Sequence, residues 1–181
     1  MPTEVHVHGY LELVEGVSAR QVEDACRPLL QEMEVAHLSE LKSMEPEQPG
    51  FFYNAGNWAL EMCCTLEVEE TFFKALEAAM VALGPLCDKA SPVEVSTYHE
   101  DGRDELQLIF VGPTAAAILD AQRREMLADV GGLLARHFGQ GEIDEVLGLV
   151  DQLFRRQGHA LQANDFSVGL TPGGSDRRRL H

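Results

Sequence analysis

Two segments of the chain, residues 4–13 and 58–67, alternate apolar and polar side chains, and each is followed by a pattern typical of an amphipathic helix. A period of two indicates a strand with one buried face, and a period near 3.6 indicates a helix with one buried stripe. Strands separated by single helices restrict the chain to folds in which helices cover a sheet. In the first strand the polar face carries His6, His8, Tyr10 and Glu12.

The two predicted helices have clear boundaries. Ser18 and Gln21 have the spacing of a capping box, so the first helix should begin there and run to about Met33. Pro28 lies inside its apolar stripe and lacks a backbone donor, which predicts a bend or a local break. The second helix is expected over 69–83, because Gly84 and Pro85 follow it.

The segment between the first helix and the strand at 58–67 is less regular. Residues 35–44 fit either a continuing helix or a poor edge strand, and we expect the edge strand. Aromatic residues at 51–53 and Trp58 flank an Asn/Gly turn, which predicts a hairpin. These aromatic side chains should pack on the protein's own core, with a ligand-stacking wall or an oligomer contact as the alternatives.

Two further strands are expected around 93–98 and 106–111. The order of elements predicts an α+β fold, with a ferredoxin-like split βαβ antiparallel sheet of four or five strands and two helices on one face. The first strand should be central, between the strand at 58–67 and the strand at 93–98. We expect this domain to span residues 1–112.

The C-terminal part predicts a helical hairpin over 113–158, with helices from Thr114 to about Phe138 and from Ile143 to about Gly158. Its apolar faces need a cover, which is either the same domain or a partner subunit. The second helix carries one narrow apolar stripe, formed by Ile143, Val146, Leu147, Val150, Leu153 and Phe154. Residues 159–181, with the basic cluster at 177–179, are expected to be largely disordered.

Charge excludes some functions. The chain has 14 Lys and Arg against 30 Asp and Glu, a net charge of −16, which disfavours nucleic-acid binding because phosphate backbones are repelled. No leader-like segment and no apolar run long enough for a membrane span is present, so we expect a cytoplasmic protein. The four cysteines lack metal-site spacing, and no cofactor is indicated.

Titratable side chains converge on the predicted sheet face opposite the two helices. We expect a ligand-binding set there: His6, His8, Tyr10, Glu61, Cys63, Glu94 and Tyr98. Three interpretations remain open, namely cross-strand packing, a polar ligand pocket, and a metal site with Glu61 or Glu94 as the third ligand. We expect packing and hydrogen bonding first, and a functional site only if the cover of the face leaves room.

The sequence therefore predicts a non-enzymatic module that binds a small molecule or a protein partner and forms a homodimer. The alternative is a small enzyme that uses the His6/His8 face for proton transfer or hydrolysis, with or without a divalent metal. These hypotheses differ in what covers that face.

Overall fold

The computed structural model describes residues 2–99 and 102–163, with side chains up to residue 158. Five strands form one antiparallel sheet in the order β2-β3-β1-β4-β5. The strands are β1 (Thr3–Glu12), β2 (Gly50–Asn54), β3 (Ala59–Val68), β4 (Ser91–Tyr98) and β5 (Asp104–Val111). The central position of β1 between β3 and β4 confirms the prediction.

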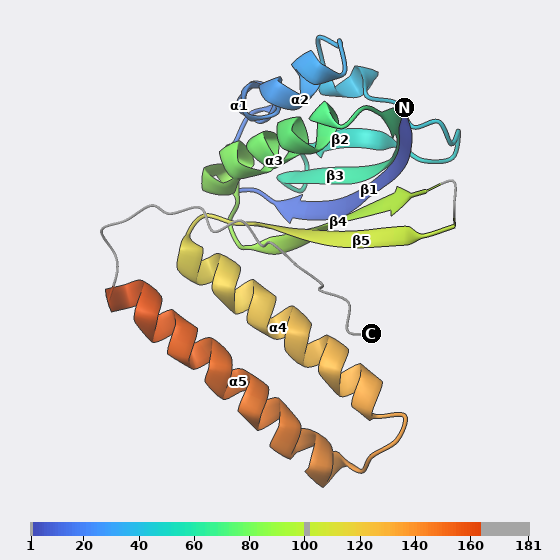
Figure 1. Cartoon of the computed structure of the whole chain (residues 1–181). Helices are drawn as coiled ribbons and strands as arrows, with labels where there is room; N and C mark the ends of the chain where they lie inside the picture. The colour runs from blue at the N-terminus through green and yellow to red at the C-terminus, as the bar shows by residue number, and fades with distance from the viewer. Residues whose placement is uncertain (1, 100–101, 164–181) are drawn as a thin grey trace.

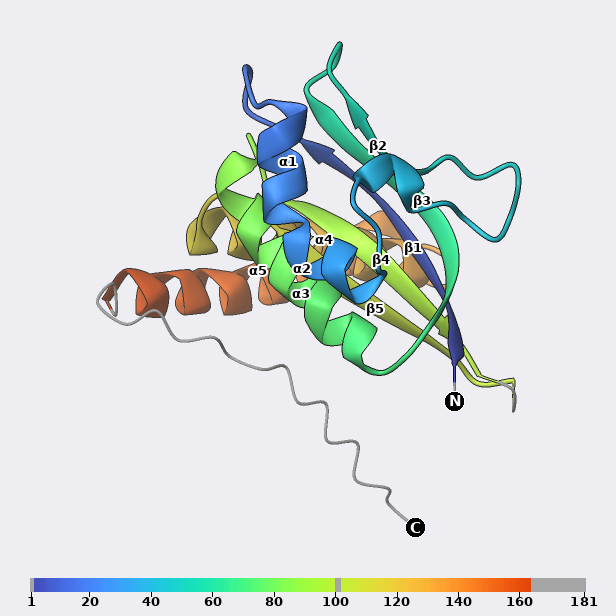
Figure 2. The same cartoon turned by 90° about the horizontal axis from the view of Figure 1, so that it is seen from above.

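One face of the sheet is covered by three helices, α1 (Ala19–Ala25), α2 (Arg27–Glu32) and α3 (Thr71–Leu83) (Figures 1 and 2). Their apolar sides and the buried sheet face form a single core, in which Phe72 and Leu11 are fully buried. This packing follows from the sequence. The apolar face of each strand and the apolar stripe of each helix leave contact with water only when the helices pack on the sheet.

The boundaries of the first helix agree with the prediction. Ser18 accepts a hydrogen bond from the backbone of Gln21, whose side chain accepts one from the backbone of Ser18. The helix breaks at Cys26, and Pro28 lies in the first turn of α2, where a missing N–H costs little. Capping and break together turn α2 so that it contacts α3.

The edge strand expected over 35–44 is wrong. This segment contains a short 3-10 helix, Leu38–Glu40, and the edge strand is β2. The Glu40 carboxylate accepts hydrogen bonds from the backbone of Ala36 and His37, and these bonds hold the turn. Leu38 and Leu41 are buried, so the segment packs on the core and does not extend the sheet.

The predicted hairpin is formed by β2 and β3. The Asn54 side chain accepts hydrogen bonds from the backbone of Gly56 and Asn57, which closes the turn. Phe51 is buried, and Tyr53 and Trp58 pack partly against the core, as expected. Phe52 departs from the prediction, because it is 51% exposed on the other face of the sheet.

Helices α4 (Ala115–Leu134) and α5 (Gln140–Ala163) form the predicted helical hairpin. Figure 1 shows the hairpin below β5. Helix α4 contacts two strands of the sheet, β4 and β5. Helix α5 continues past Gly158, so the helix end expected there is wrong. The remainder of the expected disordered tail, residues 164–181 with the basic cluster, lies outside the described residues. Among the described helices, none is long and apolar enough to cross a membrane.

Candidate ligand-binding face of the sheet

The predicted site residues share the face of the sheet opposite α1–α3, which we call the open face. Because β1 alternates, Val5, Val7 and Leu11 are buried against the helices and the intervening residues point the other way. The strand register places His8 between Cys63 and Glu94. The same register pairs Tyr10 with Glu61 and Glu4 with Tyr98.

The helical hairpin leaves much of this face uncovered. His8 and Glu94 are exposed, and Tyr10 and Tyr98 retain 44% and 39% of their surface. Phe52, which the register places beside Glu61, is 51% exposed and also belongs to this face. The open face is therefore accessible to a ligand around the middle of β1.

His6 is held by a chain of hydrogen bonds that runs through Thr65 on the neighbouring strand to the loop beside β3. Its Nδ1 lies 3.0 Å from the hydroxyl of Thr65, which is buried. The Thr65 hydroxyl donates to the side-chain oxygen of Gln48 at 3.0 Å, and the Ser43 hydroxyl donates to the same oxygen at 2.6 Å. Since the Thr65 hydroxyl has one proton and gives it to Gln48, it accepts from His6. This network favours the tautomer of His6 with its proton on Nδ1, in which Nε2 keeps a lone pair.

The surroundings of His6 also favour its neutral form. Partial burial lowers the pKa of His6, the neighbouring His8 lowers it further, and Glu94 acts in the opposite direction. The two imidazole rings stack with their centroids 6.2 Å apart. His6 is thus a neutral hydrogen-bond acceptor at neutral pH.

Carboxylates dominate the charge of the open face. The register places six on its strands, and these strand positions include no Lys or Arg: Glu4, Glu12, Glu61, Glu67, Glu94 and Asp104. Two of them have partners. Glu61 accepts from the Asn54 amide at 3.2 Å, and Glu12 pairs with Lys89 at 2.6 Å. Exposed Glu94 adds negative charge directly beside His8.

The metal-site interpretation, in which Glu61 or Glu94 would be the third ligand, finds no support in the geometry of the described residues. Within residues 2–99 and 102–163, no group of three or more His, Cys, Asp or Glu side chains is arranged to hold a metal ion. The two histidines and their stacked rings instead fit the packing and hydrogen-bonding interpretation.

The cysteines divide into two kinds. Cys26, Cys64 and Cys87 are buried, and burial raises the pKa of their thiols to about 12, 11 and 11, so they remain protonated. Cys63 is partly exposed on the open face beside His8.

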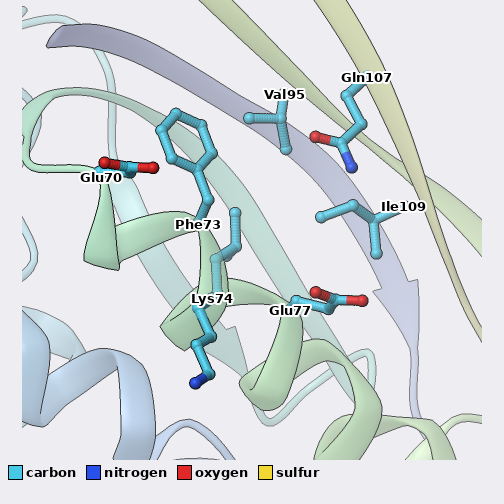
Figure 3. Close-up of a pocket in the computed structure, with 8 residues that line it drawn as sticks. Glu70, Phe73, Lys74, Glu77, Val95, Gln107 and Ile109 are labelled. Carbon is cyan, nitrogen blue, oxygen red and sulfur yellow. The ribbon is translucent and has the colours of Figure 1, made fainter. Parts of the chain in front are cut away.

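Sequence reasoning missed the residues that support His6 through Thr65. Ser43 and Gln48 lie in an irregular loop without periodicity, so no local signal connects them to β1. It also missed a hollow of about 360 Å³ on the helix side of the sheet, between α3 and β5 (Figure 3). Phe73, Val95 and Ile109 contribute its apolar part, with Lys74 and Glu77 among the charged residues that line it.

Fold and site together define an α+β protein with one helix-covered sheet face, one acidic open face and an appended helical hairpin. The chain belongs to the family of unknown function DUF6806, whose model matches residues 3–155. This match begins in β1 and extends into α5, so it covers the whole sheet, α4 and part of α5. No curated protein and no solved structure matches the chain.

Proposed function

We propose that the protein is a non-enzymatic binding module, built on a ferredoxin-like split βαβ sheet, whose open face takes a small organic cation with N–H donors. The order of the first four strands, with two helix-bearing crossovers on one face, supports this fold. Residues 113–158 are then an addition to the ferredoxin-like domain. A cytoplasmic location is part of the proposal.

The observation that carries the proposal is the combination of groups around β1. Exposed Glu94 supplies negative charge and His6 Nε2 supplies a neutral acceptor near the middle of β1. Exposed Tyr10 and Tyr98 supply aromatic surface toward its two ends. Cations are attracted to carboxylates and to aromatic faces, and their N–H groups donate to an imidazole lone pair. The same charges repel anions and nucleic acids.

The test uses spermidine as the cationic probe and citrate as the anionic control, with the imidazole signals of His6 and His8 followed by NMR. We expect spermidine to shift both signals in a saturable way and citrate to leave them unchanged. Glu94→Gln should weaken spermidine binding about two- to fivefold, as for an exposed ion pair. The matched control Glu15→Gln removes the same charge from an exposed turn and should change binding less.

Two outcomes would overturn this function. One is the absence of any saturable shift, and the other is an equal loss of affinity in Glu94→Gln and Glu15→Gln, which would mean that only net charge matters.

A second function, general-base catalysis of hydrolysis, is supported by one observation. The His6 Nδ1 lies 3.0 Å from the Thr65 hydroxyl, which supports the tautomer with Nε2 as the base, and the lowered pKa of His6 keeps that base neutral near pH 7. Hydrolysis of p-nitrophenyl acetate provides a simple probe. Site-specific catalysis requires that His6→Gln abolish the rate above buffer while His137→Gln, at an exposed histidine of the hairpin, preserves it. Equal rates in both variants exclude it.

A further inference from the structure

The helical hairpin carries a row of large apolar side chains that remain largely exposed to solvent. The row, which we call the outer stripe, comprises Met126, Leu133, Val146, Leu149 and Leu153. Their exposed fractions are 47%, 62%, 39%, 63% and 59%. Water contact at five such positions on one helix pair is costly unless another surface covers them.

The outer stripe lies on one side of the hairpin. The contact between α4 and α5 is defined by Arg123, which pairs with Asp151 at 2.8 Å, and by Leu147, which lies next to Gly131. With 100° per residue from those positions, the five stripe residues fall on the same side of the helix pair. The α5 part follows the 3-4 spacing of a coiled-coil seam, which favours another helix as the partner.

Charge identifies which partner the outer stripe suits. Residues 1–113 contain 21 acidic and 6 basic residues, a net charge of −15, whereas residues 114–158 contain 7 and 5, a net charge of −2. Two copies of this chain therefore repel each other strongly through the sheet domain and only weakly through the hairpin. A membrane surface is a poor partner, since amphipathic helices that bind anionic lipids are basic on their polar face.

Charged residues of both signs border the outer stripe. Asp129 and Arg136 lie along α4 and the following turn, and Glu142 and Arg156 lie along α5. In a two-fold symmetric dimer the same border of each chain faces the other chain. Acidic residues of one copy can then contact basic residues of the second copy.

The face is large enough for a specific contact. Helix α4 has 20 residues and is therefore about 30 Å long, and two helices side by side are about 20 Å wide. That whole side of the hairpin measures about 600 Å² in each copy, so a pair that uses all of it buries about 1,200 Å², the lower end of specific interfaces.

We infer that two copies of the chain pack their outer stripes together, so that the two hairpins form a four-helix interface and leave both open faces accessible. This inference is independent of the proposed cation binding, because it uses another surface.

The experiment measures the mass of the full chain by light scattering over a 100-fold range of concentration. We expect a dimer of about twice the 20.0 kDa chain mass that dissociates on dilution. The double variant Leu149→Gln/Leu153→Gln should raise the dimer dissociation constant at least about 100-fold, because each leucine loses apolar burial in both copies. Glutamine preserves helix propensity and adds no charge, so circular dichroism should be unchanged.

The matched control is Phe52→Gln/Leu106→Gln. These residues lie on the open face and are 51% and 65% exposed, close to the values for Leu153 and Leu149. We expect this variant to dimerise like the unmodified protein. A chain that is monomeric at all concentrations would overturn the inference. So would a control variant that loses the dimer while the hairpin variant keeps it, since the interface would then be the open face.

Discussion

The open face and the outer stripe expose apolar side chains to a similar degree, yet they suit different partners. Leu106 on the sheet is 65% exposed and Leu149 on the hairpin is 63% exposed. Around Leu106 the strands carry carboxylates and no Lys or Arg, whereas the hairpin is nearly neutral with both signs present. Exposure alone therefore does not identify a self-association surface, and the charge around it decides what each surface can bind.

The largest loss of stability is expected from a substitution in the buried core, in contrast to substitutions on the two exposed surfaces. Phe72→Ala empties a fully buried position between α3 and the sheet, so it should lower the free energy of unfolding by about 3–5 kcal/mol. Leu133→Ala, at a position 62% exposed, should cost less than about 1 kcal/mol in the monomer. Urea denaturation at low protein concentration measures both. A loss above about 2 kcal/mol for Leu133→Ala would place that side chain in a packed core.

The junction between the two regions should be the next most sensitive point. A Cβ on Gly112 would lie 2.4 Å from the Cβ of Ala90 and 3.3 Å from Ile118, so Gly112→Ala should destabilise the fold by about 1–3 kcal/mol. Gly132→Ala is the matched control, because nothing lies within 4 Å of that Cβ in α4, and it should stabilise by about 0.5–1 kcal/mol. Opposite signs in thermal denaturation are expected. A neutral Gly112→Ala would mean that α4 is not fixed against the sheet.

Removing the hydrogen bonds that link His6 to Gln48 should cause an intermediate loss of stability. Thr65→Val removes the hydroxyl between His6 and Gln48, so it should cost about 1–2 kcal/mol and also release the Nδ1 tautomer of His6. Thr97→Val, on the opposite face of β4, is the control with the same change of shape. Urea denaturation gives the stability, and nitrogen chemical shifts of the imidazole report the tautomer. An unchanged tautomer in Thr65→Val would contradict the network.

The electrostatic coupling on the open face should give the smallest effect. His8→Ala should raise the pKa of His6 and Glu94→Gln should lower it, since His8 and Glu94 act in opposite directions. Because the pKa of folded His6 lies below that of the unfolded chain, stability falls as the pH decreases from about 6.5 through the folded pKa. NMR titration of the imidazole measures each pKa. Shifts of the same sign in both variants would reject the assignment.

The sheet and the convergence on its open face were predictable from the sequence. Period-two alternation determines which side of a strand a residue occupies, so the placement of His6, His8 and Glu61 followed once the strand order was inferred. Residues 35–44 were not predictable, because their 3-10 turn depends on a Glu40 carboxylate that bonds to the backbone. Ser43 and Gln48 reach Thr65 only through the tertiary fold.

The hairpin shows a different limit. The sequence assigned Val146 and Leu153 to the same narrow stripe as Leu147 and Phe154, but the structure separates them. Leu147 and Phe154 are partly buried, whereas Val146 and Leu153 are exposed together with Leu149. Residues that the sequence assigns to one apolar stripe can thus include some that face the partner helix and others that face outward. Periodicity alone does not separate the two groups.

The most direct test of the two-surface account is hydroxyl-radical labelling of the full chain at low and at 100-fold higher concentration, with and without spermidine. The account predicts that concentration protects Leu149 and Leu153 while Tyr10 and Tyr98 stay reactive, and that spermidine protects Tyr10, two positions along β1 from His8, and neither leucine. Protection of the tyrosines by concentration, with the leucines still reactive, would contradict it.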